Sequence, residues 1–522
     1  MTTENTSSIE TDSTPGESIS FWQTLRSREG AIMLGIALAT VLIHLWTGNK
    51  FGFHRDELAT LEDARHLDWG YVAYPPITPF FGRLSLELFG TSLNGFRFFA
   101  YIAQAIAVVL AGMMALHLGG KRWSVVVACL AGVPFCLVGG ALMQYVSFDY
   151  LCWVLAAYFV VRLTTSGDPR WWLGIGSAIG MGMITKYTMG FFALGIVAGV
   201  LATEFRQHLK SKWLWMGVVL SLLICLPNFI WQVQHGFISL DFLKHIHERD
   251  IRIGRTKDFL PDQIKLTLFA LPLWLTGLYF TLLSPRGKRF RMLGWMYVVP
   301  LVLFVIAKGR GYYLGAAYPM LYAAGAVAME LWKEKWRGNS PAWRTYAFQT
   351  IVGLALFANI VIIATFTLPV GTINSAWWKV ASNIQGDFRE ELGWEELTET
   401  VAKIRDTIPQ NERAHLGILA GNYGEAGAIN LYGTQYGLPH AISGINSFWQ
   451  RGYGDPPPET LIVIGISEKY RNAHFSACEL AGHTGNKYGV PNEETEDHPD
   501  IFVCRGMKQS WQEFWKDFQY FG

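Results

Sequence analysis

The sequence predicts an α-helical protein that crosses a membrane many times and ends in a soluble α/β domain. Hydrophobic residues make up 51% of the 522 residues and charged residues only 16%, whereas an ordinary soluble domain is roughly 25% charged. The apolar residues gather in about eleven blocks near the length of roughly 20 residues that a bilayer-spanning helix needs. Beyond residue 369 such blocks are absent, and the patterns become those of a soluble domain.

The apolar blocks define a membrane domain over residues 31–368. A tail at residues 1–30, rich in Ser, Thr and Glu, is predicted to be disordered and cytoplasmic. No cleavage site accompanies the first block, which is therefore expected to stay as a signal anchor. The blocks lie at residues 31–48, 93–118, 124–142, 147–163, 172–185, 188–203, 214–231, 264–283, 292–307, 313–331 and 346–368.

Loop charge predicts the orientation of these blocks. The basic segments all fall on one side of the proposed helices, and an excess of Lys and Arg marks the cytoplasmic side. They are residues 121–122, 162–170, 206–212, 286–291 and 333–344. Loops 49–92 and 232–263 and the domain 369–522 are therefore predicted to be extracytoplasmic.

The extracytoplasmic segments carry recognisable patterns. In the first loop, residues 57–69 and 77–89 are amphipathic, which suits helices lying along a membrane surface. In the C-terminal domain, a helix is predicted at residues 394–408. Buried strands are predicted at residues 415–420 and 461–465. The string Asn422 to Ala428 has glycines typical of a strand-to-helix turn, with acceptor recognition as the alternative.

Two acidic residues follow the first block directly, in the string His54-Arg55-Asp56-Glu57-Leu58. A carboxylate at the membrane surface can take the proton of an acceptor hydroxyl as a general base. The alternative is an ordinary solvated start of a helix, since acidic residues favour first turns.

This string belongs to a longer pattern that resembles the GT-C glycosyltransferases. More narrowly, it resembles family 39, the protein O-mannosyltransferase and aminoarabinose transferase group, in its bacterial Rgt-like branch. The motifs that carry the resemblance are Arg55-Asp56-Glu57-Leu58, Ala64-Arg65-His66-Leu67, Trp69-Gly70-Tyr71 and Pro75-Pro76-Ile77-Thr78-Pro79.

The resemblance implies a transferase of the bacterial inner membrane that takes a sugar from a polyprenyl-phosphate donor. Its acceptor would be an envelope glycan such as lipopolysaccharide, a lipid or a protein. Asp56 matches the family's catalytic carboxylate, with Glu57 beside it. Arg55 is assigned to the donor phosphate and His54 to the substrate.

A second acid, Asp149, follows Ser147 where the fourth block begins. An acid at a membrane boundary costs free energy and is by default a functional-site hypothesis. The resemblance places the family's second acidic residue here. The alternative is that Ser147 or Asp149 caps the helix.

Two basic strings lie at predicted extracytoplasmic ends of blocks. In the string Thr185-Lys186-Tyr187-Thr188, Lys186 is predicted to bind the donor phosphate and Tyr187 the substrate. The alternative is that Lys186 is an ordinary lysine at the membrane interface. Lys308-Gly309-Arg310-Gly311-Tyr312-Tyr313 offers Lys308 and Arg310 to a phosphate, and Tyr312 and Tyr313 to the face of a sugar. The alternative for the second string is an interfacial aromatic belt.

Other polar residues bear on cofactors and cross-links. The family often has an acidic residue paired with His or Lys before the double proline, where this chain has Ala73 and Tyr74, so no metal is expected to be required. His235, His245, His247 and Glu248 are spaced loosely for a metal and are expected to be structural or exposed. Cys478 and Cys504 are candidates for a disulfide, which an oxidising compartment permits.

The predicted reaction is an inverting displacement in which Asp56 deprotonates the acceptor, and Asp149 and Glu57 either orient the acceptor or tune Asp56. Lys186 and Arg310 would stabilise the leaving phosphate. A transporter or lipid flippase would share the hydrophobic content but usually has repeats and midplane polar residues, and no repeat is evident here. A scaffold for envelope assembly would need no acid beside the basic residues.

Overall fold

The computed structural model describes residues 21–337 and 341–522. Residues 1–20 of the predicted tail lie outside this range. For residues 21–30 the prediction of disorder is wrong, because Phe21–Leu25 form α1 and α2 begins at Arg28. Ser27 is the N-cap of α2, and its hydroxyl accepts a hydrogen bond from the amide of Gly30 at 3.1 Å.

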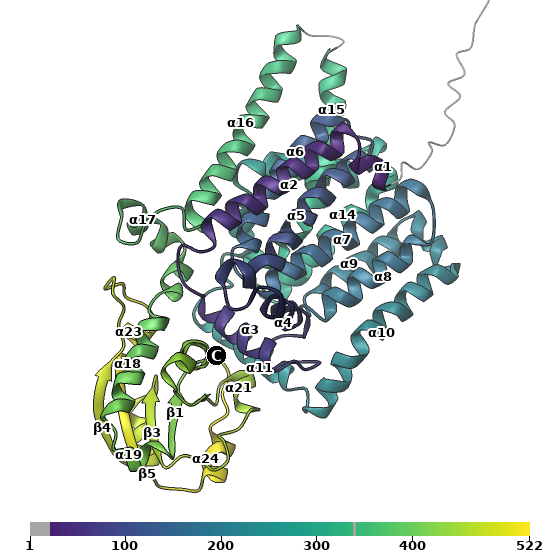
Figure 1. Ribbon diagram of the computed structural model, residues 1–522. Coiled ribbons are helices and arrows are strands. Elements are labelled where there is room, and N and C mark those ends of the chain that lie inside the picture. The colour runs from purple at the N-terminus through teal and green to yellow at the C-terminus, as the bar shows by residue number, and fades with distance from the viewer. Residues whose placement is uncertain (1–20, 338–340) are drawn as a thin grey trace, which may run out of the picture.

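Each apolar block forms a helix or a broken pair of helices, which confirms the predicted polytopic fold. The helices fill the upper part of Figure 1. They are α2 (Arg28–Thr47), α5 (Leu93–His117), α6 (Arg122–Gly140), α7 (Tyr145–Ser166), α8 (Trp171–Met183), α9 (Met189–Ala202), α10 (Lys212–Gln234), α12 (Phe259–Thr267) with α13 (Leu271–Leu282), α14 (Arg291–Ile306), α15 (Tyr318–Arg337) and α16 (Ala342–Thr367).

Fewer helices reach the length of a full crossing than the roughly eleven apolar blocks of the sequence. Within the described parts of the chain, nine helices are long and apolar enough to span a bilayer, or ten if α9 and the bent 3₁₀ helix η1 (Glu204–Lys210) form one span. The difference arises from α8 and α9, which have 13 and 14 residues. At 1.5 Å per residue, such helices reach only about 20 Å, short of the roughly 30 Å hydrocarbon core.

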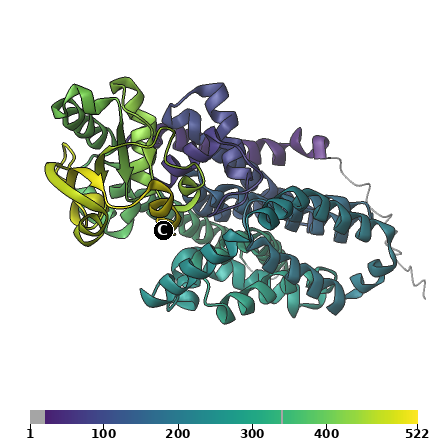
Figure 2. The same ribbon diagram turned by 90° about the horizontal axis from the view of Figure 1, so that it is seen from below.

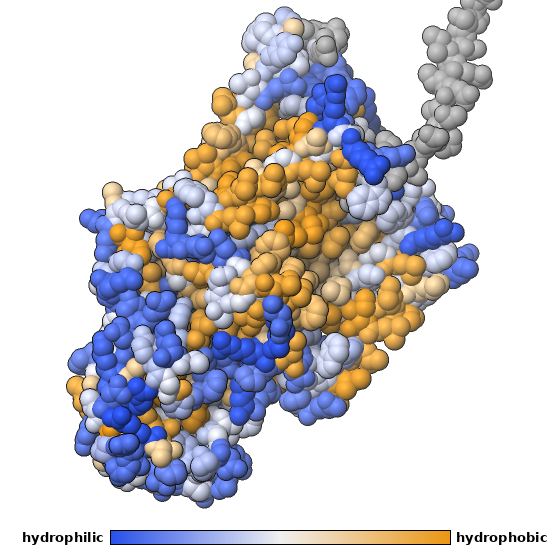
Figure 3. Space-filling view, in the orientation of Figure 1, coloured by the Kyte–Doolittle hydropathy of each residue, from blue (hydrophilic) through white to orange (hydrophobic). Residues whose placement is uncertain are grey.

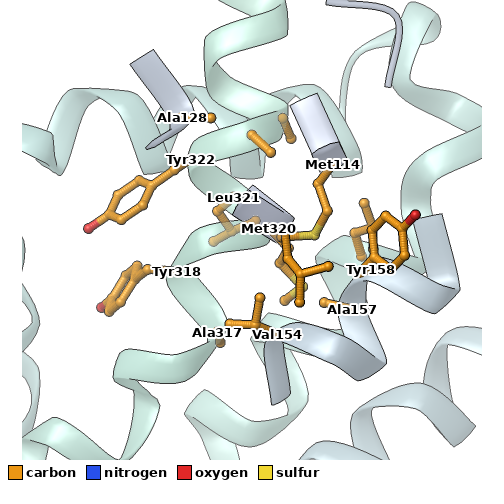
Figure 4. Packing of buried hydrophobic residues seen from close by; sticks show 14 of the residues in the cluster. Met114, Ala128, Val154, Ala157, Tyr158, Ala317, Tyr318, Met320, Leu321 and Tyr322 are labelled. Carbon is orange, nitrogen blue, oxygen red and sulfur yellow. The ribbon is translucent and has the colours of Figure 1, made fainter. Parts of the chain in front are cut away.

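The core of the membrane part lies between α5, α6, α7 and α15. Figure 4 shows Met114, Ala128, Val154 and Leu321 from these four helices turned toward one another, and all four residues are fully buried. Apolar surface faces outward as well, and Figure 3 shows it as a wide hydrophobic band between hydrophilic ends. A hydrophobic belt of this kind is what a lipid-exposed bundle requires.

The C-terminal part is a small α/β unit with one five-stranded sheet, in the order β2-β1-β3-β5-β4. The strands are β1 (Leu416–Ala420), β2 (Ala441–Ile442), β3 (Thr460–Ile464), β4 (Phe475–His483) and β5 (Asp500–Met507). β1 pairs in parallel with β2 and β3, whereas β5 runs antiparallel to β3 and β4. β1 and β3 are buried along their whole length, which explains why both were visible as apolar runs.

Helices surround this sheet and connect it to the membrane part. They are α17 (Ala376–Ile384), η5 (Gly386–Glu391), α18 (Trp394–Thr407), α19 (Gln410–Arg413), α20 (Tyr423–Tyr432), η6 (Gly433–Tyr436), α21 (Asn446–Trp449), α22 (Glu468–His474), α23 (Glu493–Glu496) and α24 (Trp511–Asp517). The predicted helix at 394–408 is thus α18.

Both predicted extracytoplasmic loops contain helices. The two amphipathic stretches of the first loop form α3 (Arg55–Arg65) and α4 (Ile77–Phe89), and the second loop contains α11 (Ile238–Arg252). Figure 1 places α3 beside the α/β unit, where it packs against α20, whereas α4 packs against α3 and the membrane helices α5 and α7. The view from below in Figure 2 shows the α/β unit, in green and yellow, at one side of the helical bundle. The remaining connections include 3₁₀ helices, which are η2 (Leu268–Ala270), η3 (Pro285–Phe290) and η4 (Gly311–Ala317).

Glycine lets the α/β unit approach α3 closely. A Cβ atom on Gly427 of α20 would lie 2.8 Å from the Cβ of Leu58 and 3.0 Å from its carbonyl oxygen. A Cβ on Gly424 would lie 3.0 Å from the Cβ of Arg55. Contacts below about 3.4 Å leave no room for a methyl group, so this close packing needs glycine. The string Asn422 to Ala428 therefore brings the α/β unit against the first residues of α3.

Candidate active site

Two cavities meet between the membrane helices and the α/β unit. The larger has a volume of about 1590 Å³ and the smaller about 500 Å³. The residues that line both cavities include one acid, four basic side chains and three tyrosines. These are Asp56, Tyr145, Lys186, Arg249, Arg255, Arg310, Tyr313 and Tyr423.

Asp56 is the accessible carboxylate at this junction. It lies in the first turn of α3, and 43% of its side chain is exposed. Tyr423 donates a hydrogen bond to Oδ1 at 2.9 Å, and Gln144 donates to Oδ2 at 3.1 Å. Burial and the charge of Asp56 raise the pKa of Tyr423, so its phenol remains a donor. Both oxygens of Asp56 are thus oriented while the carboxylate stays open to the cavities.

Glu57 faces the opposite way and has no exposed surface. Its Oε1 accepts hydrogen bonds of 2.8 Å from Arg97 Nε and from the amide of Met143. Its Oε2 accepts the amide of His54 at 3.0 Å, which closes the capping box of α3. Glu57 lines neither cavity and instead joins α3 to α5, so the geometry gives it no access to a substrate.

His54 and Arg55 line the larger cavity but already have protein partners. His54 Nδ1 accepts the amide of Asp56 at 3.1 Å and caps α3. Arg55 pairs with Glu493 and lies 3.7 Å from Glu390, with its guanidinium 5.0 Å from the ring of Tyr423. These contacts hold the α/β unit against α3 and leave Arg55 largely neutralised.

Lys186 lies among aromatic rings instead of carboxylates. Its Nζ is 4.0 Å from the ring centre of Tyr313, 4.9 Å from that of Tyr145 and 5.3 Å from that of Tyr312. Among the residues that the structure describes, no carboxylate oxygen lies within 4 Å of it. A lysine held by ring faces keeps its charge available for an anion in the cavity.

Arg310 also reaches the junction, but it carries a resident partner. Its Nε and Nη2 donate to the two oxygens of Asp250 at 2.6 and 2.9 Å. Nη1 lies 3.4 Å from the hydroxyl of Tyr312. Arginine binds two oxygens of a phosphate through two N–H groups in the same bidentate geometry. Lys308 lines only the smaller cavity, where its backbone adopts a left-handed φ of 48°.

The predicted polar residues of α7 and the following turn lie close by. Asp149 lines the larger cavity, and Trp153 donates to its Oδ1 at 3.1 Å. The alternative of a cap is wrong, because α7 begins at Tyr145 and Gln144 is its N-cap residue. Tyr187 lines the smaller cavity, with its hydroxyl 3.0 Å from both Asn228 Oδ1 and Gln232 Nε2.

The walls away from the junction are apolar. The smaller cavity is bounded by side chains from α9, α11 and α14, namely Phe191, Phe242, Leu243, Ile246 and Phe304. The larger cavity has an apolar side formed by α6 and α16, including Phe135, Val138 and Ile363. Its other side is polar and is formed by η5 and α23 of the α/β unit.

Metal ligands do not gather at the junction. Within residues 21–337 and 341–522, no group of three or more His, Cys, Asp or Glu side chains is arranged to hold a metal ion. His235 instead stacks on Trp231 at 3.9 Å between ring centres. Whether the reaction requires a metal stays a prediction. Cys478 and Cys504 form a disulfide that links β4 to β5.

The sequence analysis did not assign Gln144, Tyr145, Asp250 and Tyr423 to the site, nor Arg249 and Arg255, which lie in the last turn of α11 and just beyond its end. Gln144, Tyr145 and Asp250 stand in strings with no family motif, and they reach the junction only through the packing of α6, α7 and α11. Tyr423 lies 367 positions from Asp56. The one available signal was the glycine-rich string around Tyr423, because the glycines mark a close backbone approach.

Fold and site together define a multi-pass membrane protein with a polar junction between a helical bundle and an α/β unit. Comparison with known proteins agrees with this architecture. Residues 73–231 match the sequence model of the family described as dolichyl-phosphate-mannose-protein mannosyltransferase.

A curated relative is similar in part. It is the undecaprenyl phosphate-alpha-4-amino-4-deoxy-L-arabinose arabinosyl transferase 1 of Pseudomonas fluorescens, 27% identical over 269 residues. The match covers 47% of this chain and 47% of that protein, so it spans about half the length of each.

Solved structures share the fold along nearly the whole chain. ArnT from Cupriavidus metallidurans in the apo state has a TM-score of 0.56 at 14% identity, covering 91% of this chain and 97% of ArnT. The same protein bound to undecaprenyl phosphate has a TM-score of 0.55 at 14% identity, covering 92% and 98%. The oligosaccharyltransferase of Archaeoglobus fulgidus has a TM-score of 0.51 at 11% identity, covering 91% and 76%. The chain therefore has the ArnT-like fold.

Proposed function

We propose that this protein is a membrane glycosyltransferase of the GT-C type that moves a sugar from a polyprenyl-phosphate donor to an acceptor hydroxyl. The observation that carries the proposal is that Asp56 and Lys186 line both cavities at their junction. A base and a phosphate-binding cation are the two groups that such a transfer needs at one point. The relatives named for undecaprenyl-phosphate and dolichyl-phosphate chemistry support the same donor class.

The donor is assigned by charge and hydropathy. A polyprenyl chain requires an apolar path next to an anion site, and both cavities are lined by apolar side chains as well as by Lys186. Lys186 forms no ion pair within 4 Å among the described residues, and Asp149 interacts with its charge only from farther away, so a phosphate entering there supplies a close counter-charge. Tyr312 and Tyr313 beside it offer ring faces to the sugar.

In the proposed reaction, Asp56 activates the acceptor. Its carboxylate takes the proton of the acceptor hydroxyl, and the acceptor oxygen forms a bond to the anomeric carbon. The bond from that carbon to the phosphate oxygen breaks on the opposite side, which inverts the configuration. The leaving polyprenyl phosphate keeps the electron pair, and Lys186 and Arg310 stabilise its charge. Asp149 orients the acceptor, whereas Glu57 supports α3.

The proposal also includes the orientation of the protein in the membrane and the chemical class of the acceptor. The basic loops are assigned to the cytoplasm, so the cavities and the α/β unit face outward. The acceptor is a glycan, lipid or protein of the cell envelope, and the narrower resemblance to the Rgt-like branch stays a prediction. A transporter, a flippase or a scaffold would use these cavities without breaking the donor.

A turnover experiment tests this function. Purified protein in lipid nanodiscs is incubated with undecaprenyl-phosphate pentoses, hexoses and amino sugars together with envelope extracts, and the products are analysed by mass spectrometry. We expect at least one donor to yield free undecaprenyl phosphate and a glycosylated acceptor. Intact donors throughout, combined with movement of undecaprenyl phosphate across liposomes, would contradict the proposal and favour a flippase.

A further inference from the structure

Asp250 on α11 occupies the anion-binding face of Arg310. The two side chains form a two-point ion pair at 2.6 and 2.9 Å, and only 5% of the Asp250 side chain is exposed. Arg310 itself lines both cavities. The arginine best placed for the donor phosphate is thus already bound to a carboxylate of the same chain.

The surroundings of Asp250 are rich in positive charge. Arg255 Nη1 lies 3.9 Å and Arg249 Nε 4.0 Å from its Oδ1, and both arginines line the two cavities. The nearby carboxylate of Asp262 is engaged by Lys265 at 3.1 Å. In the described parts of the chain, Asp250 is thus the carboxylate that these three arginines share, and an external anion such as a phosphate has the charge that fits the same position.

The charge of the substrate changes during the proposed reaction. A polyprenyl-phosphate sugar is a phosphodiester with one negative charge. When the bond to the anomeric carbon breaks, the leaving polyprenyl phosphate becomes a monoester with about −1.5 to −2 charges, as phosphate monoesters do near neutral pH. The demand for a second cation arises only as the phosphate leaves.

We propose that Asp250 is an exchangeable counter-ion of Arg310. It holds the arginine in the empty and donor-bound site, and it yields the arginine to the phosphate as the second negative charge develops. The inference rests on the proposed donor class. Asp250 is a positioning residue that acts through Arg310, because it serves neither the acceptor hydroxyl nor the sugar.

This exchange has a consequence for the product. An unpaired Arg310 beside Lys186 would hold the monoester strongly and slow its release. Competition from Asp250 weakens that binding, and it does so more for the doubly charged monoester than for a singly charged diester. A purely structural Asp250, which merely holds Arg310 in position for phosphate, would have the opposite effect when it is removed.

The test compares the binding of two probes to wild type and Asp250→Asn in nanodiscs of neutral lipid. The probes are undecaprenyl phosphate and its monomethyl ester, which carries one charge. We expect Asp250→Asn to bind undecaprenyl phosphate about tenfold more tightly, which corresponds to about 1.4 kcal/mol, with a smaller gain for the methyl ester. Weaker or equal binding of undecaprenyl phosphate by this variant would overturn the inference.

Two further variants serve as controls for this binding experiment. Asp241→Asn removes an exposed charge from the same helix, and it should leave both affinities unchanged. In an Arg310→Gln background, Asp250→Asn should no longer tighten binding, and a gain that persists there would contradict an exchange on Arg310. Binding by wild type with no effect of Asp250→Asn would refute the inference alone, whereas a wild type that binds neither probe would refute the proposed function as well.

Discussion

Adjacent residues in the first turn of α3 have different tasks. Asp56 is open to both cavities, whereas Glu57 is completely enclosed and bound to Arg97. The sequence indicated an acidic pair at the membrane surface but could not distinguish the two members. Helical geometry separates neighbouring side chains by about 100° around the axis, and the position of the buried Arg97 decides which acid turns inward.

Replacing Glu57 should therefore affect stability. Glu57→Gln removes the nearer of the two charge partners of the buried Arg97 and leaves Glu391, 3.4 Å away. Breaking a buried pair typically costs about 3–5 kcal/mol, and the remaining partner places the expected loss at the lower end. We expect a lower unfolding midpoint, with the remaining folded protein retaining its transfer rate. Glu87→Gln serves as the control, since it breaks an exposed pair with Arg83 on α4 that is worth about 1 kcal/mol or less. Normal stability with lost transfer would restore a catalytic role for Glu57.

Lys186 should contribute binding free energy to the donor phosphate. Lys186→Met removes the one positive charge held by three tyrosine rings, and an interaction with a charged group is worth about 1.5–3 kcal/mol. Undecaprenyl phosphate should therefore bind roughly 10- to 100-fold more weakly. Lys265→Met removes an equal charge that is already paired with Asp262, so its effect should be much smaller. Equal losses in the two variants would indicate only a general electrostatic attraction.

At the scale of elements, the segment from β1 to α20 connects the α/β unit to the site. Asn422 and Glu425 form a capping box, so α20 begins at Tyr423. The Tyr423 side chain can thereby reach Asp56, while Gly424 and Gly427 permit contact with α3. The sequence predicted a strand-to-helix turn here. Its partner could not be predicted, because contacts between distant segments depend on tertiary packing.

The burial of Glu425 in this capping box should make the α/β unit sensitive to pH. Burial, and next the neighbouring Glu494, raise the pKa of Glu425 to about 8, whereas an unfolded glutamate titrates near 4.3. The folded state thus binds more protons between these values, and stability should fall as pH rises from about 5 to 8. Glu425→Gln should flatten this decline, by roughly 1–3 kcal/mol at pH 8.

Thermal unfolding of wild type and variant at pH 5.5 and 8.0 measures this effect. Glu513→Gln is a matched control, because Glu513 holds the same position in the capping box of α24 but is exposed. Hydrogen bonds from Ser510 lower its pKa, so this control should not flatten the decline. An unchanged decline in Glu425→Gln would show that other groups cause the pH dependence.

At the scale of the whole molecule, hydropathy predicted the polytopic fold well, because each apolar block forms a helix. The count of crossings was less predictable, since α8 and α9 are apolar along their whole length yet too short to span. Turns at Asp168–Arg170, around Lys186 and at Thr203 set their lengths, and the blocks at residues 172–185 and 188–203 were already shorter than the roughly 20 residues of a full span. The two cavities were beyond prediction, because they arise where the bundle, α11 and the α/β unit meet.

The orientation of the molecule has its own test. Lys288→Cys lies in η3 among the basic loops, and Lys487→Cys lies in the α/β unit. With an impermeant maleimide on intact cells, we expect labelling at position 487 and none at 288 until the membrane is opened. Wild type gives the background, since Cys129, Cys136 and Cys152 are buried and the partly exposed Cys225 lies in the apolar helix α10. The reverse pattern would place the cavities on the cytoplasmic side.

The central claim is that Asp56 acts as the base at the junction of the two cavities. The most direct measurement is sugar transfer by wild type and Asp56→Asn in nanodiscs with the same polyprenyl-phosphate donor, alongside the affinity for undecaprenyl phosphate. We expect unchanged affinity and a transfer rate that falls at least about a hundredfold, as loss of a general base does. Transfer at the wild-type rate by properly folded Asp56→Asn would contradict the account.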